Sequence, residues 1–152
     1  MLILAETTIE AAMAEQVALE PELYQKLGAS SRSLMDRQSL LLATIADKLV
    51  KNSKLPSGPG LAVYCILEIQ ENEKEISPFG VLRRMPVAQA FWGALTAQAQ
   101  GSVRIFSWSP DAAEIACAQA ALDLEDGVCE NALVLCCSFS PWQVWGKAWA
   151  AH

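Results

Sequence analysis

The stretch RIFSWSPDAAEIACAQAALDLEDGVCENALVLCCSF, residues 104–139, decides the fold. It predicts, in order, a strand over 103–107, a sharp turn over 108–110, a helix over 111–126 and a strand over 132–139. The first strand alternates its side chains with a period of two, whereas the second is a continuous apolar run, as in a strand covered on both faces. Ser109 is a typical N-cap residue and Pro110 suits the first helical position. These features predict a β-α-β unit.

Further elements are predicted on both sides of this unit. They are a short strand at 2–4, a partly helical region at 7–27, a helix capped by Ser33 with Asp36 at the capping-box position, a buried strand at 61–67 and a helical region from 77 onward. After Ser140 and Pro141 we expect a final helix, on which Trp142, Trp145 and Trp149 share one face. The order β-α-β-α-β-α-β predicts an α/β fold with three layers, α/β/α, and a mostly parallel sheet in a single domain, 1–152.

The turn at 108–110 is where several α/β enzymes place a nucleophile, because helix-end amides stabilise charge there. Here Ser109 is the only hydroxyl of the turn, and no cysteine stands in it. A serine nucleophile needs a base, and the only histidine of the sequence is His152. The sequence therefore predicts the strand–turn–helix arrangement that holds a nucleophile in other enzymes, but it shows no cysteine in the turn and no evident base for Ser109.

Residues 104–139 resemble the active-site region of β-ketoacyl synthases, in which a strand ends at the catalytic cysteine and a small-residue helix follows. GVCENALV at 127–134 fits the family phrase G-x-x-(D/E)-x-ALV, which leads into the next strand. ISPFGVLRRMPVAQAFWGAL and SRSLMDRQSLLLATIADKLV are similar to the family's helical segment before the active-site strand and to its first long helix. The cysteine position falls on Ser109 or Pro110. The family's C-terminal half, with its two active-site histidines, has no counterpart in these residues.

The resemblance implies half of a thiolase-like fold. The turn SWSPD looks most like the shortened ketosynthase-like proteins of aryl polyene gene clusters. It therefore implies a non-catalytic, chain-length-factor-like subunit, which pairs with a full-length ketosynthase in a heterodimer and shapes its acyl tunnel. The chain would not be an enzyme on its own, would need no cofactor, and would meet the acyl carrier protein through the complex.

The resemblance also suggests roles for particular residues. Those expected at the tunnel or the subunit interface are Met85, Gln89, Phe91, Trp92, Phe106 and Trp108. Arg83 and Arg84 are either surface charges or contacts to the carrier protein or its phosphopantetheine. The tryptophans of the predicted final helix either pack back on the domain or dock on a partner.

Two other functions are open. Ser109 could serve a stand-alone acyl-processing enzyme, although the sequence has no G-x-S-x-G elbow. The chain could also be a binding module for an acyl carrier or a scaffold, using its tryptophan-rich C-terminal helix.

The composition narrows these choices. A net charge of -6 and the lack of a basic, aromatic patch argue against nucleic-acid binding. The hydrophobic fraction of 53% indicates either a sheet buried on both faces or an added partner surface. Five cysteines, mostly within apolar elements, are typical of reduced thiols in a cytoplasmic protein, and no metal site is expected. No run approaches the ~20 apolar residues of a membrane span.

Overall fold

The computed structural model describes residues 2–16, 25, 27–28, 34–69 and 85–151. In chain order, its elements are β1 (Leu2–Thr8), the 3-10 helix η1 (Ala11–Gln16), α3 (Arg37–Ser53), β2 (Leu61–Leu67), α5 (Pro86–Ala97), β3 (Val103–Ser107), α6 (Ala112–Glu125), β4 (Asn131–Phe139) and β5 (Trp142–Ala150). The strands predicted at 103–107 and 61–67 are confirmed, and the helix and strand predicted after the turn are confirmed to within one residue.

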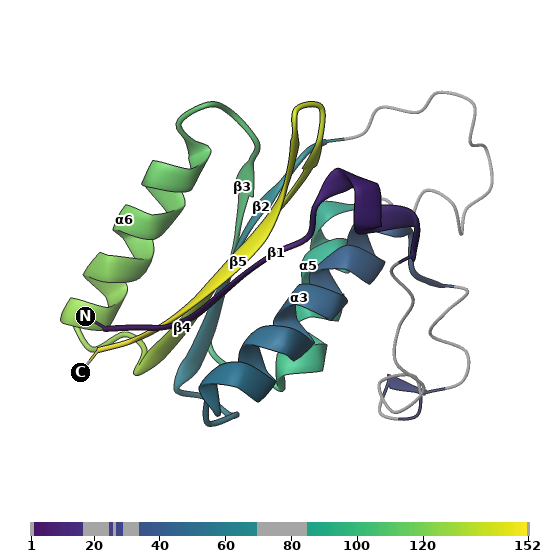
Figure 1. Cartoon of the computed structure of the whole chain (residues 1–152). Coiled ribbons are helices and arrows are strands. Elements are labelled where there is room, and N and C mark those ends of the chain that lie inside the picture. Colours follow the sequence, from purple (N-terminus) through teal and green to yellow (C-terminus); the bar gives the residue numbers. More distant parts are fainter. Residues whose placement is uncertain (1, 17–24, 26, 29–33, 70–84, 152) are drawn as a thin grey trace.

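The strands form one sheet in the order β1-β5-β4-β2-β3 (Figure 1). β2 pairs in parallel with both β3 and β4, and β5 pairs antiparallel with both β4 and β1. β1 therefore runs in the same direction as β2, β3 and β4, and β5 alone is reversed. The predicted mostly parallel sheet is confirmed in this sense.

Helices cover the sheet on both faces, so the predicted three layers are confirmed. Helices α3 and α5 lie on one face and α6 lies on the other (Figure 1). Alternate side chains of β2 enter the two cores: Cys65 packs on the α3 and α5 side, whereas Tyr64 packs on the α6 side. Every residue of β2 is consequently buried. Within the described residues, no helix is both long and apolar enough to cross a membrane.

The start of α3 differs from the prediction. Asp36 is itself the N-cap, because its Oδ1 accepts a hydrogen bond from the backbone N–H of Ser39 at 2.8 Å. A short carboxylate at this position satisfies an N–H that has no partner within the helix. Ser33, the expected cap, lies outside the described residues.

The predicted C-terminal helix is wrong. Residues 142–150 form β5, which pairs along its whole length with β4 and turns back through Ser140 and Pro141. Trp142 packs on the α3 side of the sheet, whereas Trp145 and Trp149 pack on the α6 side. A spacing of three residues places side chains on one face of a helix but on opposite faces of a strand. The three tryptophans therefore share no common face, and Trp149 is 5% exposed.

Candidate functional site

The turn between β3 and α6 holds the candidate nucleophile position. The backbone N–H of Trp108 donates to the Leu67 carbonyl at 2.8 Å, which extends the β2–β3 ladder by one residue. The N–H of Ala112 then donates to the Ser109 carbonyl at 3.1 Å, closing a tight turn with Pro110 as its second residue. Proline is favoured there because its fixed φ suits the turn.

The helix that follows begins later than predicted. α6 starts at Ala112 with Asp111 at the N-cap position, so Ser109 is not the cap and Pro110 is not the first helical residue. The Asp111 side chain makes no capping hydrogen bond. Ser109 is half-buried, and no described side chain forms a hydrogen bond with its hydroxyl. His152, the one histidine of the sequence, lies outside the described residues.

The cysteines are poor nucleophiles in this fold. Burial raises the pKa of Cys65 and that of Cys136 to about 12. Burial also raises the pKa of Cys137, Cys129 and the half-buried Cys117. Because the thiolate is the reactive form, all five thiols are held in their unreactive state near neutral pH. Within the described residues, no group of histidine, cysteine and acidic side chains is arranged to hold a metal ion.

The residues expected at a tunnel lie in two groups, which the sheet separates. Gln89 and Trp92 of α5 are buried on one side, and Gln89 donates to Asp36 Oδ2 at 2.6 Å. Phe106 and Trp108 pack in the core under α6, on the other side. The two remaining residues are exposed: Met85 is 44% exposed and Phe91 is 53% exposed. Arg83 and Arg84 lie outside the described residues.

Two apolar surfaces are left open. β3 is the last strand of the sheet order, so its outer edge is unpaired within the described residues, and α5 packs beside it. We define the β3 edge surface by the exposed residues Val87, Phe91, Leu95, Val103 and Ile105. We define the outer α6 surface by the exposed residues Ile115, Leu122 and Val128. Apolar side chains on the solvent side of a helix that already packs a sheet are typical of a helix covered on both sides.

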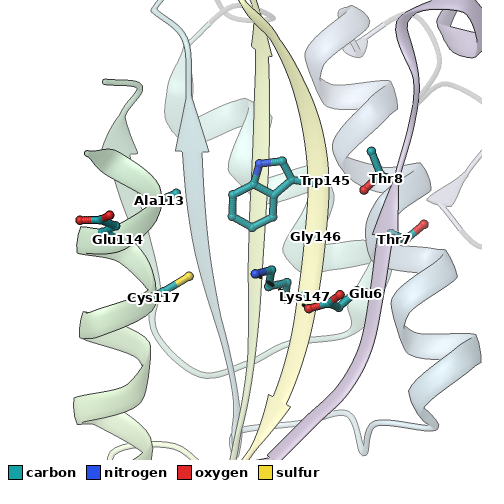
Figure 2. A pocket seen from close by; sticks show the side chains of 9 residues that line it. All are labelled: Glu6, Thr7, Thr8, Ala113, Glu114, Cys117, Trp145, Gly146 and Lys147. Carbon is teal, nitrogen blue, oxygen red and sulfur yellow. Dashed lines mark ion pairs between the residues drawn. The ribbon is translucent and has the colours of Figure 1, made fainter. Parts of the chain in front are cut away.

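A groove lies between α6 and the β1–β5 pair and has a volume of about 430 Å³ (Figure 2). Lys147 of β5 crosses its floor, where its Nζ is 3.9 Å from Glu6 Oε1 and 5.5 Å from the centre of the Trp145 ring. Cys117 of α6 points into the groove from the opposite wall (Figure 2). Sequence reasoning missed this groove because it placed Trp145 on a helix. The alternation of large and small residues from Val144 to Trp149 was the available signal for a strand.

A buried polar network ties β2, β3 and α6 together. The Tyr64 hydroxyl, which is fully buried, donates to Asp123 Oδ2 at 2.6 Å, and Gln119 Nε2 donates to Asp123 Oδ1 at 2.9 Å. Arg104 Nε lies 3.6 Å from Asp123 Oδ2. Cys129 Sγ is 3.9 Å from the same hydroxyl. These polar side chains were not singled out by sequence reasoning, because the contacts join residues up to 65 positions apart.

Replacing Tyr64 with phenylalanine is expected to lower the free energy of unfolding by about 1–2 kcal/mol, because Asp123 loses its shortest donor. Burial, followed by the hydrogen bond to Asp123, raises the pKa of Tyr64 above its ordinary value of 10.0. The folded state therefore holds this proton more tightly, so its contribution to stability is complete below pH 10 and is lost at higher pH. Urea unfolding at pH 9 to 11 checks this.

The expected contrast is a steeper loss of stability in the wild type than in Tyr64→Phe above pH 10, by up to about 1.4 kcal/mol per pH unit. Four of the five cysteines, Cys65, Cys117, Cys136 and Cys137, form no hydrogen bond with the Tyr64 hydroxyl in the described part of the chain, so their titration cancels in the difference between the two proteins. Burial raises the pKa of Cys129, but its contact with that hydroxyl lowers it, so the comparison is repeated in a Cys129→Ala background. Equal slopes would mean that the Tyr64 proton is not held by the fold.

No protein-family model matches the sequence, and no curated protein matches it significantly. Solved structures do match. The ketosynthase from module 6 of the bacillaene synthase of Bacillus subtilis 168 aligns with 95% of this chain at a TM-score of 0.66 and 14% identity. An oxazolomycin ketosynthase domain from Streptomyces albus JA3453 aligns with 80% of it at a TM-score of 0.53 and 19% identity.

The chain spans 30% and 34% of the length of these two ketosynthases. At such low identity the likeness concerns the fold alone. The predicted half of a thiolase-like fold is confirmed, and the chain has a ketosynthase-like fold.

Proposed function

We propose that this chain is a non-catalytic, chain-length-factor-like subunit, which pairs with a full-length β-ketoacyl synthase and shapes its acyl tunnel. This is the role that the sequence resemblance to the shortened ketosynthase-like proteins of aryl polyene gene clusters implies. Condensation on an acyl carrier protein is carried out by the partner's own cysteine and histidines. The observation that carries the proposal is the β3–α6 turn, where a ketosynthase-like fold holds Ser109 and Pro110 instead of cysteine.

The chemistry of the chain's own side chains supports this role. Ser109 has no base among the described residues, and the pKa of every thiol is raised by burial. A serine without a base is a weak nucleophile. The helix N-terminus beside Ser109 could stabilise negative charge, but it cannot remove the hydroxyl proton. Condensing chemistry is therefore assigned to the partner.

The β3 edge surface supports a partner. An unpaired edge strand offers its free N–H and C=O groups to another strand, and proteins normally protect such an edge. On the α5 side of this edge, Val103 and Ile105 are apolar and are 43% and 37% exposed, and Phe91 of α5 extends the patch. Of the residues expected at a tunnel or interface, Met85 and Phe91 are the two exposed ones, at 44% and 53%, so they are the ones that could reach a partner.

Co-expression tests the proposal. The chain, carrying an affinity tag, is produced with each complete ketosynthase encoded in the same genome. We expect one of them to co-elute in equal amounts, and to release products of a different chain length than the same ketosynthase alone. A chain that is a monodisperse, soluble monomer and binds none of these ketosynthases would refute the proposal.

Ser109→Ala gives a second test, aimed at the acyl-enzyme alternative. We expect the variant complex to keep its product yield within about twofold, because Ser109 makes no covalent intermediate. A fluorophosphonate probe should label neither the wild-type chain nor the Ser109→Ala chain. Labelling of the wild type that disappears in Ser109→Ala would instead favour a stand-alone acyl-processing enzyme.

A further inference from the structure

Arg104 is the single charged residue of β3, and it stands at the edge where the proposed partner docks. In the strand register it lies directly opposite Tyr64, so both side chains point to the α6 side of the sheet. Its side chain is 46% exposed, whereas that of Asp123 is only 6% exposed. Asp123 is therefore covered by the chain itself, whereas about half of the Arg104 side chain is left exposed.

Asp123 is held in place independently of Arg104. Tyr64 and Gln119 donate to its two oxygens at 2.6 and 2.9 Å, and the backbone carbonyl of Asp123 accepts from the N–H of Val128 at 2.8 Å. The carboxylate thus has a fixed position and two donors before any ion pair is counted. Arg104, in contrast, has Asp123 as its one ion-pair partner within the described residues.

A strand that pairs with β3 would cover the exposed half of Arg104. Covering an unpaired guanidinium is strongly unfavourable, so an opposite charge must come either from the partner or from this chain. Here this chain supplies it. We propose that Asp123 is a built-in counter-ion for Arg104, which lets β3 accept an apolar strand of the ketosynthase partner that brings no carboxylate to this position.

This inference rests on the proposed function, and it specifies the chemistry of the partner's edge. On the opposite face of β3, Val103 and Ile105 are exposed and carry no charge. Because Asp123 already neutralises Arg104, a partner strand without charged side chains can pair with β3 along its whole length. Opposite-sign charge on the partner would add nothing here.

The test measures the Kd between the ketosynthase that co-elutes and variants of this chain, by isothermal titration calorimetry. Asp123→Asn keeps the size of the side chain but removes its charge. We expect it to raise the Kd at least about tenfold, because Arg104 is then covered without a counter-ion. Asp126→Asn, on an exposed acid three residues further on, is the matched control and should change the Kd less than about twofold.

Arg104→Met separates the two possible sources of charge. If this chain supplies the counter-ion, Arg104→Met keeps the Kd within about threefold, and adding Asp123→Asn to it has no further effect on binding. If the partner supplies a carboxylate, Arg104→Met leaves that group buried and unpaired and raises the Kd about tenfold or more, which overturns the inference. Thermal melts check folding. If Asp123→Asn does not fold, a Kd raised about tenfold or more in Arg104→Met still overturns the inference.

Different results would overturn the proposed function and the counter-ion role of Asp123. A wild-type chain that binds no ketosynthase overturns the proposed function together with the inference. A wild-type chain that binds, while Asp123→Asn binds equally well, overturns only the inference.

Discussion

Gly146→Ala is expected to lower the free energy of unfolding by about 2–3 kcal/mol, because a methyl group at this position has no room. A Cβ on Gly146 would lie 2.5 Å from Ile45 Cγ2 and 2.7 Å from Leu49 Cδ1. Both side chains belong to α3 and are fully buried. To admit the methyl group, α3 must move away from β5 or its side chains must leave their rotamers. Urea unfolding monitored by tryptophan fluorescence measures the loss.

Two controls make this prediction specific. A Cβ on Gly60 would approach only the side chain of Glu130, an exposed residue that can swing away, so Gly60→Ala should cost less than about 1 kcal/mol. Ile45→Ala should cost less in the Gly146→Ala background than in the wild type, because it removes the nearest clashing atom. Equal costs of Ile45→Ala in both backgrounds would contradict the proposed contact.

Phe91→Glu is expected to weaken binding to the ketosynthase partner by about 100-fold or more, because aromatic residues at the centre of an interface dominate its energy. Phe91 is 53% exposed and meets Trp92 edge to face, with ring centres 5.5 Å apart. A glutamate there would be solvated in the free chain but buried without a counter-ion in the complex. The Kd and the thermal melt are measured together, and the melting temperature should change little.

Ile115→Glu is the matched control, because Ile115 is 54% exposed but belongs to the outer α6 surface. We expect it to leave the Kd within about threefold, because the proposed contact with the ketosynthase is the β3 edge surface and not the outer α6 surface. The reverse result, with binding lost in Ile115→Glu and kept in Phe91→Glu, would place the partner on α6 rather than on the β3 edge surface.

The central β-α-β unit could be predicted because its signals are local. A continuous apolar run marked β4, and small residues ending at Gly127 marked α6, so the predicted boundaries agree with the structure to within one residue. The C-terminal strand could not be predicted in the same way. Its tryptophans fit a helical spacing, and what decides for a strand is pairing with β4, which becomes visible only when both segments are placed in the sheet.

The candidate site was predictable only in its position along the chain. The turn at Ser109 falls where the sequence placed it, but the cap moved to Asp111 because Pro110 occupies the second position of a tight turn. The network around Asp123 depends on contacts between three elements distant in sequence. Exposure of Phe91 beside a buried Trp92 likewise depends on which side of α5 the sheet covers, which residue type alone does not reveal.

The reversed strand β5 lies between β4 and β1, so among the described residues the strand that comes latest in the sequence separates β1 from the rest of the sheet. During synthesis, β1 has no neighbour to pair with until residues 142–150 have emerged from the ribosome. A shortened chain that lacks these residues would leave β1 detached and uncover one side of β4. Loss of partner binding after such a truncation would consequently report a collapsed sheet rather than a missing docking tail.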